Sequence, residues 1–159
     1  MTDEIHKYID VIKKEQGFIN LSNNEVKDIL KMGKLRKFKR GEVVFKEGET
    51  GDEFFIILKG SIRISTNVPG IGEEALAVLK SGEFFGEMAL IDNTVRSATA
   101  VSNEETELFS INRINFNNLI QETNPFAYKI IWGLVKKLSA RLRETDERLK
   151  AILALIKSF

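Results

Sequence analysis

The chain has 159 residues, 43% hydrophobic and 30% charged, which is enough for one domain with a buried core. Its 24 Lys and Arg nearly balance 23 Asp and Glu, so no global positive field is available to hold a nucleic acid. Because it has no cysteine and only one histidine, His6, we expect no disulfide, no metal site and no Cys- or His-based catalysis. We therefore expect a protein that is not an enzyme.

The distribution of apolar residues also indicates where in the cell the protein is expected. Residues 1–10 mix acidic and basic side chains and lack the apolar stretch of a secretory signal. The longest uninterrupted apolar runs, residues 54–58 and 152–156, are too short to cross a bilayer. We expect a soluble, cytoplasmic protein that makes no contact with a membrane.

Residues 1–34 are predicted to form N-terminal helices. The first helix has isoleucines at helical spacing, at Ile5, Ile9 and Ile12. The second begins at a capping box made by Ser22 and Glu25, and Gly33 is its expected stop. The basic run at residues 31–40 fits this helix end and a following strand with a solvated face, so we do not interpret it as a nucleic-acid site.

Residues 35–111 have the character of strands. Segments 42–46 and 53–65 are rich in Val, Ile and Phe. Glycines separate the segments at positions 41, 48, 51, 60, 70, 72, 82 and 86. Residues 67–70 resemble a hairpin loop before a strand at 75–79. Short strands between frequent turns predict a mainly β fold, an antiparallel β-roll or jelly roll flanked by helices.

Residues 112–159 return to helical spacing. Phe116, Leu119 and Ile120 fit a short helix, and Asn124 and Pro125 are typical of the N-cap and first position of a long one. Positions separated by alternating steps of three and four residues form a heptad seam, at Tyr128, Ile131, Val135, Leu138, Leu142, Thr145, Leu149, Ile152, Ile156 and Phe159.

This seam has two interpretations. A long amphipathic helix lying on its own barrel would have a period of 3.6, which drifts off a 3.5 seam. The unbroken 3.5 repeat favours a two-stranded coiled coil and hence a homodimer through residues 135–159, with Tyr128 and Ile131 left to pack on the barrel. Arg141 at a g position and Asp146 at the next e position can then pair across a parallel dimer.

Residues 82–101 are the most informative segment for function. A glycine at 86 lets backbone N–H groups approach a ligand closely. Arg96 offers a planar set of donors that matches phosphate oxygens, and Ser97 adds a hydroxyl. Glu87 would repel a phosphate, so it fits only a ligand that also has hydroxyl donors, such as a ribose. The alternative is that Glu87 and Arg96 form a surface ion pair of little energetic value.

Over residues 18–155 the chain resembles the cyclic nucleotide-binding domain family. FGEMAL at residues 85–90 and RSA at 96–98 look like that family's phosphate-binding cassette. GEVVFKEG at 41–48, GD at 51–52 and IILKG at 56–60 resemble its glycine-punctuated first half. The short motifs are weak alone, and their combination with the glycine frame and the flanking helices carries the resemblance.

The resemblance implies a role for each residue of the cassette. Arg96 would pair with the exocyclic oxygens of a cyclic phosphate, Glu87 would accept from the ribose 2′-hydroxyl, and Ser97 would bond the phosphate. The rest of the cradle would be formed by Phe85, Gly86, Met88, Ala89 and Ala98. Since a threonine after the arginine accompanies cyclic GMP in the family, Ser97 favours cyclic AMP and leaves cyclic GMP open.

The resemblance also places base contacts on the C-terminal helix. Thr145 would suit an adenine amino group. Asp146 would either accept from a guanine edge or pair with Arg141 of a partner chain, and we favour the ion pair.

We therefore expect a sensor module that binds cyclic AMP, forms a homodimer and signals to an effector protein that the sequence does not identify. The family's transcription factors continue into a helix-turn-helix, and this sequence has no such segment, so direct DNA binding is not expected. The alternatives are a dimerising interaction module of the same fold without a ligand, and an enzyme built on a jelly-roll scaffold.

Overall fold

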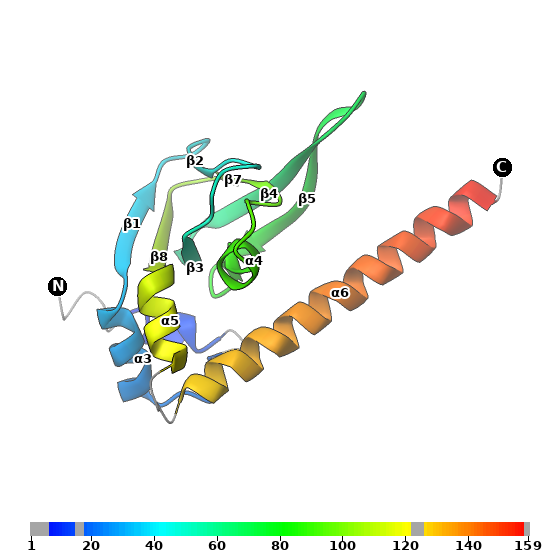
Figure 1. Cartoon of the computed structure of the whole chain (residues 1–159). Helices are drawn as coiled ribbons and strands as arrows, with labels where there is room; N and C mark the ends of the chain where they lie inside the picture. The colour runs from blue at the N-terminus through cyan, green and yellow to red at the C-terminus, as the bar shows by residue number, and fades with distance from the viewer. Residues whose placement is uncertain (1–6, 15–17, 122–125, 158–159) are drawn as a thin grey trace.

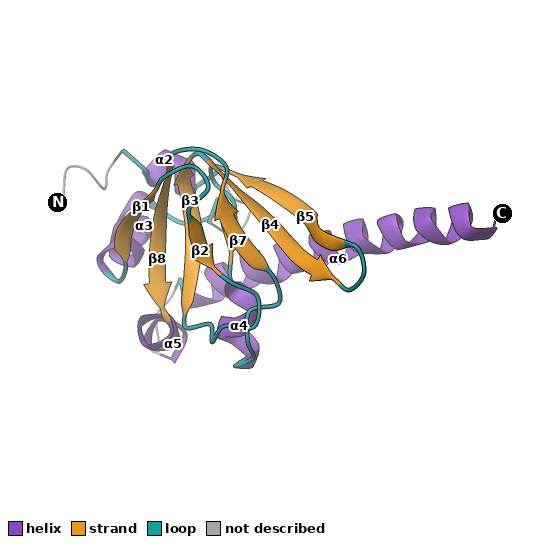
Figure 2. Cartoon of the chain, turned by 90° about the horizontal axis from the view of Figure 1, so that it is seen from above, coloured by secondary structure: helices purple, strands orange, loops and turns teal. Residues whose placement is uncertain are grey.

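The computed structural model describes residues 7–14, 18–121 and 126–157. They form a roll of two four-stranded antiparallel sheets, with helices at its flanks and one long C-terminal helix (Figures 1 and 2). This architecture confirms the predicted fold class. The expectations for Ile5, for Asn124 with Pro125 and for Phe159 fall outside the described residues. None of the helices described is long and apolar enough to cross a membrane.

Each sheet joins strands that are distant in sequence. The first sheet has the order β1 (Lys34–Phe38), β8 (Thr106–Asn112), β3 (Glu53–Lys59) and β6 (Phe84–Phe85). The second has the order β2 (Val43–Phe45), β7 (Thr99–Ser102), β4 (Ser61–Val68) and β5 (Gly72–Lys80). β3 and β4 are consecutive in the chain but lie in different sheets, because the chain turns at Gly60, whose φ is +85°.

The β4–β5 hairpin differs in detail from the predicted loop. Asn67 pairs with Glu73 and Val68 with Gly72, so Asn67 and Val68 belong to the strand and the connection is shorter than residues 67–70. Gly70, with a φ of +79°, and Gly72, with a φ of +111°, supply the left-handed backbone that this tight turn requires.

The helices are α2 (Ile9–Ile12), α3 (Asn23–Lys31), α4 (Glu87–Asp92), α5 (Arg113–Gln121) and α6 (Ala127–Lys157). The capping box of α3 is confirmed: the Glu25 amide donates to the Ser22 hydroxyl, and the Ser22 amide donates to the Glu25 carboxylate at 2.6 Å. The predicted stop at Gly33 is confirmed, because α3 ends at Lys31 and its C-cap, Met32, directly precedes Gly33, whose φ is not positive. A Cβ there would lie 2.3 Å from the Phe109 ring, so Gly33 permits close approach of the chain to β8.

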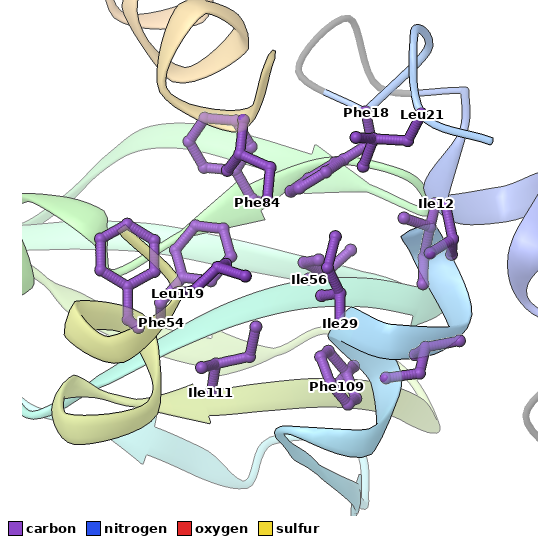
Figure 3. Close-up of a cluster of buried hydrophobic side chains, with 14 of the residues drawn as sticks. Ile12, Phe18, Leu21, Ile29, Phe54, Ile56, Phe84, Phe109, Ile111 and Leu119 are labelled. Atoms are coloured by element: carbon purple, nitrogen blue, oxygen red, sulfur yellow. The ribbon is translucent and has the colours of Figure 1, made fainter. Parts of the chain in front are cut away.

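Two pairs of consecutive phenylalanines each contribute one ring to each of two hydrophobic clusters. Phe54 and Phe84 pack with the helices on the outer face of the first sheet (Figure 3), with ring centroids 5.3 Å apart. Phe55 and Phe85 point into the roll and stack at 5.1 Å. This follows from the alternation of side chains along a strand. All four phenylalanines are buried and belong to the core.

The long helix α6 faces the chain's own core with its buried positions Ala127, Ile130, Gly133 and Leu134. The expectation that Tyr128 and Ile131 pack on the barrel is wrong, since they are 67% and 38% exposed. The core takes the adjacent face of the helix and leaves the heptad seam uncovered. Beyond its first turns α6 runs beside the roll, where Arg148 donates to the Leu76 carbonyl oxygen of β5 at 2.8 Å, and its C-terminal end projects past the roll (Figure 2).

Candidate functional site

The candidate site begins where β6 leads into the short helix α4. Gly86, at this junction, has a φ of +79°, which L side chains rarely adopt. A Cβ on Gly86 would lie 2.8 Å from Nη1 of Arg96 and 3.2 Å from the Glu53 carbonyl oxygen. Glycine at this position therefore allows the chain to pass directly over an arginine side chain.

Arg96 is buried beneath this turn, with 5% of its surface exposed. Its Nη1 donates to the Gly86 carbonyl oxygen and its Nη2 to the Glu53 carbonyl oxygen, both at 2.8 Å. Its guanidinium lies 4.1 Å from the centroid of the Phe45 ring. The Nε atom is buried and has no hydrogen-bond partner among the described residues. A buried donor without a partner is uncommon and destabilising.

The backbone of Arg96 is fixed by the loop between β2 and β3. Its amide donates to the Glu49 carbonyl at 2.8 Å, and its carbonyl accepts from the Gly48 amide at 2.9 Å. Burial lowers the pKa of the Arg96 guanidinium, and the nearby carboxylates of Asp52 and Glu53 oppose that shift. The side chain thus carries a desolvated positive charge, which an anion would stabilise.

Glu87, the first residue of α4, is 3% exposed. Its Oε1 accepts from Nη1 of Arg141 on α6 at 2.7 Å. Nη2 of the same arginine donates to the Phe84 carbonyl oxygen at 2.5 Å, and the guanidinium lies 5.1 Å from the Phe84 ring centroid. Arg141 therefore connects the long helix to both ends of the β6–α4 turn.

The alternative of a surface ion pair between Glu87 and Arg96 is wrong. Both side chains are buried. Arg96 donates to backbone carbonyls, and Glu87 pairs with Arg141. The two side chains therefore have separate partners.

Four of the predicted site residues are exposed. Met88 and Ser97 lie at the surface of the cassette, where the Ser97 hydroxyl contacts the Met88 sulfur at 3.9 Å. Thr145 lies on α6 and donates to the Arg141 carbonyl oxygen of its own helix at 2.9 Å. Asp146 lies beside it, also exposed. The structure thus brings the cassette residues together, including the buried Phe85, Ala89 and Ala98, whereas from α6 it is Arg141 that touches them.

Two further residues shape the site: Gly51, from the GD pair at residues 51–52, and Arg113, which belongs to no motif noted in the sequence. Gly51 leaves room for the cassette, since a Cβ there would lie 2.4 Å from Ala89 and 2.9 Å from Nε of Arg96. Arg113, at the start of α5, donates to the carbonyl oxygens of Ala89 at 2.8 Å and Leu90 at 3.0 Å. It also donates to the Gly51 carbonyl and thereby fastens α4 to the β2–β3 loop.

The comparison with known proteins agrees with this geometry. The model of the cyclic nucleotide-binding domain matches residues 35–123, which include the eight strands except the first residue of β1, together with α4 and Arg96. The chain belongs to the cyclic nucleotide-binding domain family. The matched residues include the buried arginine and the glycine turn described above.

Relatives of this chain include receptors and kinases. It is 35% identical over 129 residues to the cyclic AMP receptor protein of Thermus thermophilus, covering 81% of this chain and 58% of that one. It is 31% identical over 144 residues to human cGMP-dependent protein kinase 2, covering 89% of this chain and 18% of the kinase. The chain thus spans less than two thirds of the length of either relative.

A solved structure shares the fold over most of its length. A cyclic nucleotide-binding domain from Methylobacillus flagellatus superposes with a TM-score of 0.82 at 26% identity. The match covers 92% of this chain and 83% of that one.

Proposed function

We propose that this domain binds cyclic AMP through Arg96 and Glu87 and signals this binding to a partner protein. The observation that carries the proposal is the buried Arg96 with an unpartnered Nε, beneath the left-handed turn at Gly86. A phosphate oxygen would neutralise the guanidinium and accept from its free donor. Glu87 would accept from the ribose 2′-hydroxyl of the same ligand.

The fit extends to the residues around these two charges. A Cβ at Gly86 or Gly51 would collide with the Arg96 side chain, so both glycines allow the guanidinium to hold the position in which it would meet a phosphate. Ser97, exposed beside the cassette, is free to turn its hydroxyl to the phosphate. Because Arg141 bonds Glu87 at 2.7 Å, ligand entry requires this side chain to share or release the carboxylate.

We assign the base as adenine on the identity of two hydroxyl residues. Ser97 stands where a threonine accompanies cyclic GMP in the family, and Thr145 suits an adenine amino group. Relatives named for each nucleotide occur, namely the cyclic AMP receptor protein and cGMP-dependent protein kinase 2. The proposed preference for adenine therefore rests on Ser97 and Thr145 rather than on similarity to these relatives.

Thermal melting with each nucleotide tests this proposal. A ligand at 100 times its Kd stabilises the folded chain by about 2.7 kcal/mol. For a domain of this size that raises Tm by about 5–10 °C. We expect this shift with cyclic AMP and a smaller one with cyclic GMP at the same concentration. If neither nucleotide changes Tm, the ligand-independent interaction module is the better account.

We further propose that the domain forms a parallel homodimer through α6. The seam residues Val135, Leu142, Leu149, Ile152 and Ile156 are all exposed in the single chain. A row of large apolar side chains on one helix face is typical of a surface that another helix covers. Sedimentation equilibrium of the wild type should give the mass of a dimer, and Leu149→Asp should give a folded monomer. A monomeric wild type would contradict this assembly.

A further inference from the structure

Arg141 lies between the proposed ligand site and the proposed dimer seam. It belongs to the g position of the heptad, which flanks the seam, yet its Nη1 and Nη2 reach Glu87 and the Phe84 carbonyl of the same chain. A guanidinium has five N–H donors in a planar fork. The side chain therefore retains donors that can bind a second carboxylate.

Asp146 is the acidic residue that the helix register brings to this point. It follows Arg141 by five positions, from a g position to the next e position, and these two positions meet across a parallel two-stranded coil. Its side chain is exposed, and no hydrogen bond or ion pair engages it within residues 7–14, 18–121 and 126–157. Lys150, one turn further along, pairs with Glu147 at 2.7 Å.

We infer that the partner subunit's Asp146 binds the Arg141 guanidinium and so completes the ligand site from across the dimer. The inference rests on the proposed function, both for the dimer and for the role of Glu87. Arg141 then stands between two carboxylates, one at the ligand site and one in the seam. Because the two share its donors, the seam carboxylate weakens the hold of Arg141 on Glu87, which is thereby available to a ribose hydroxyl.

This arrangement makes Asp146 a positioning residue that couples ligand binding to dimerisation. A dimer that presents Asp146 binds the nucleotide more tightly than a single chain, and by linkage each nucleotide bound to one of its two sites stabilises the dimer by that same factor. Neither carboxylate need touch the other, since the guanidinium connects them.

A double-mutant cycle on the dimer Kd of the whole chain tests the pairing. The dimer contains the pair twice, and an exposed pair contributes about 0.2–1 kcal/mol, so Asp146→Asn should weaken the dimer about 2- to 30-fold. In an Arg141→Gln background, Asp146→Asn should have no further effect, and Asp146→Glu should keep the wild-type Kd. Glu147→Gln, at the neighbouring outward position, is the matched control and should leave the dimer unchanged. Additive effects of the two substitutions would overturn the pairing.

The affinity for cyclic AMP is a second measurement, which an ion pair with a purely structural role would not change. Asp146→Asn should lower the affinity of the dimer for cyclic AMP about fivefold, the lower end of the allosteric effects that are commonly measured. In the Leu149→Asp monomer, the same substitution should leave the affinity for cyclic AMP unchanged. An unchanged affinity in the dimer would overturn the coupling. A monomeric wild type or a wild type that does not bind the nucleotide would instead contradict the proposed function, so the two failures are distinguishable.

Discussion

Arg141 and Glu87 are 54 positions apart in sequence, and their side chains meet at 2.7 Å. The contact is asymmetric, because 29% of the Arg141 side chain is exposed and only 5% of that of Glu87. Water can solvate the arginine if its partner is lost, but it cannot reach the carboxylate to the same degree. The two ends of the pair should therefore respond differently to substitution.

Arg141→Gln should destabilise the ligand-free domain more than Glu87→Gln does. The first change leaves a buried carboxylate without its charged partner, at about 1–3 kcal/mol, and the second replaces it with a neutral amide that still accepts from Arg141. Urea unfolding of the two variants measures the difference. Lys150→Gln, which breaks an exposed pair with Glu147, is the control and should stay within about 0.5 kcal/mol of the wild type. Equal losses in the two main variants would show that burial of Glu87 does not govern the pair.

Gly86 and Gly70 provide a matched test of the turn over Arg96, since both have a φ of +79°. Alanine at either position pays the same left-handed strain, about 1–2 kcal/mol. At Gly70 a Cβ meets nothing within 4 Å, whereas at Gly86 it would lie 2.8 Å from Nη1 of Arg96. Gly86→Ala should therefore also displace the guanidinium and weaken cyclic AMP binding about tenfold or more, which corresponds to about 1.4 kcal/mol.

Melting curves and calorimetric titrations of the two alanine variants separate the two effects. We expect similar backbone strain in both and a loss of affinity only in Gly86→Ala. If Gly70→Ala loses as much affinity, the effect is one of general stability and the close approach to Arg96 is not important for binding.

The ion pair between Glu25 and Lys129 makes part of the stability dependent on pH. Lys129 Nζ lies 2.8 Å from Oε1 of Glu25 and ties α6 to α3. The hydrogen bond from Lys129 holds the pKa of Glu25 below its ordinary value of 4.5, and bonds with Ser22 act in the same direction. A carboxyl whose pKa is lowered on folding stabilises the protein above its unfolded pKa and loses that contribution as the pH falls through its folded pKa.

Glu25→Gln keeps the capping box, because glutamine can also close it, and removes the charge. At neutral pH the wild type should be more stable than this variant, and the difference should shrink as the pH falls below 4.5. Thermal melts without denaturant, at a series of acidic pH values, measure this difference in stability. A difference that does not change with pH would mean that the charge of Glu25 contributes nothing.

Local rules of the sequence predict much of this fold. The capping box at Ser22 and the alternation of Phe54 and Phe55 depend on neighbours within a few residues, and both are found. The face of α6 that meets the core was harder to predict, because Ile130 and Leu134 form a second apolar stripe beside the heptad seam. Periodicity shows two such stripes and does not decide which one the roll covers.

The candidate site likewise has a part that the sequence predicts and a part that only the complete fold shows. Glu87 and Arg96 lie within one short segment, so their residue types alone suggest a ligand that combines a phosphate and a sugar. The contact of Arg141 with Glu87, and those of Arg113 with Ala89 and Leu90, join segments brought together only by the complete fold. No spacing in the sequence encodes them.

Isothermal titration of the folded chain with cyclic AMP, in the wild type and in Arg96→Ala, tests the central claim most directly. We predict saturable binding to the wild type and a loss of about thirty- to a hundredfold in the variant, since a charge-assisted contact with phosphate contributes about 2–3 kcal/mol. Arg96→Lys keeps the charge without the planar fork, controls for a folding defect, and should have an affinity between those of the wild type and Arg96→Ala. Arg63→Ala, on β4, should bind cyclic AMP as the wild type does. Equal affinity in the wild type and both Arg96 variants, all folded, would contradict the assignment of Arg96 as the phosphate ligand.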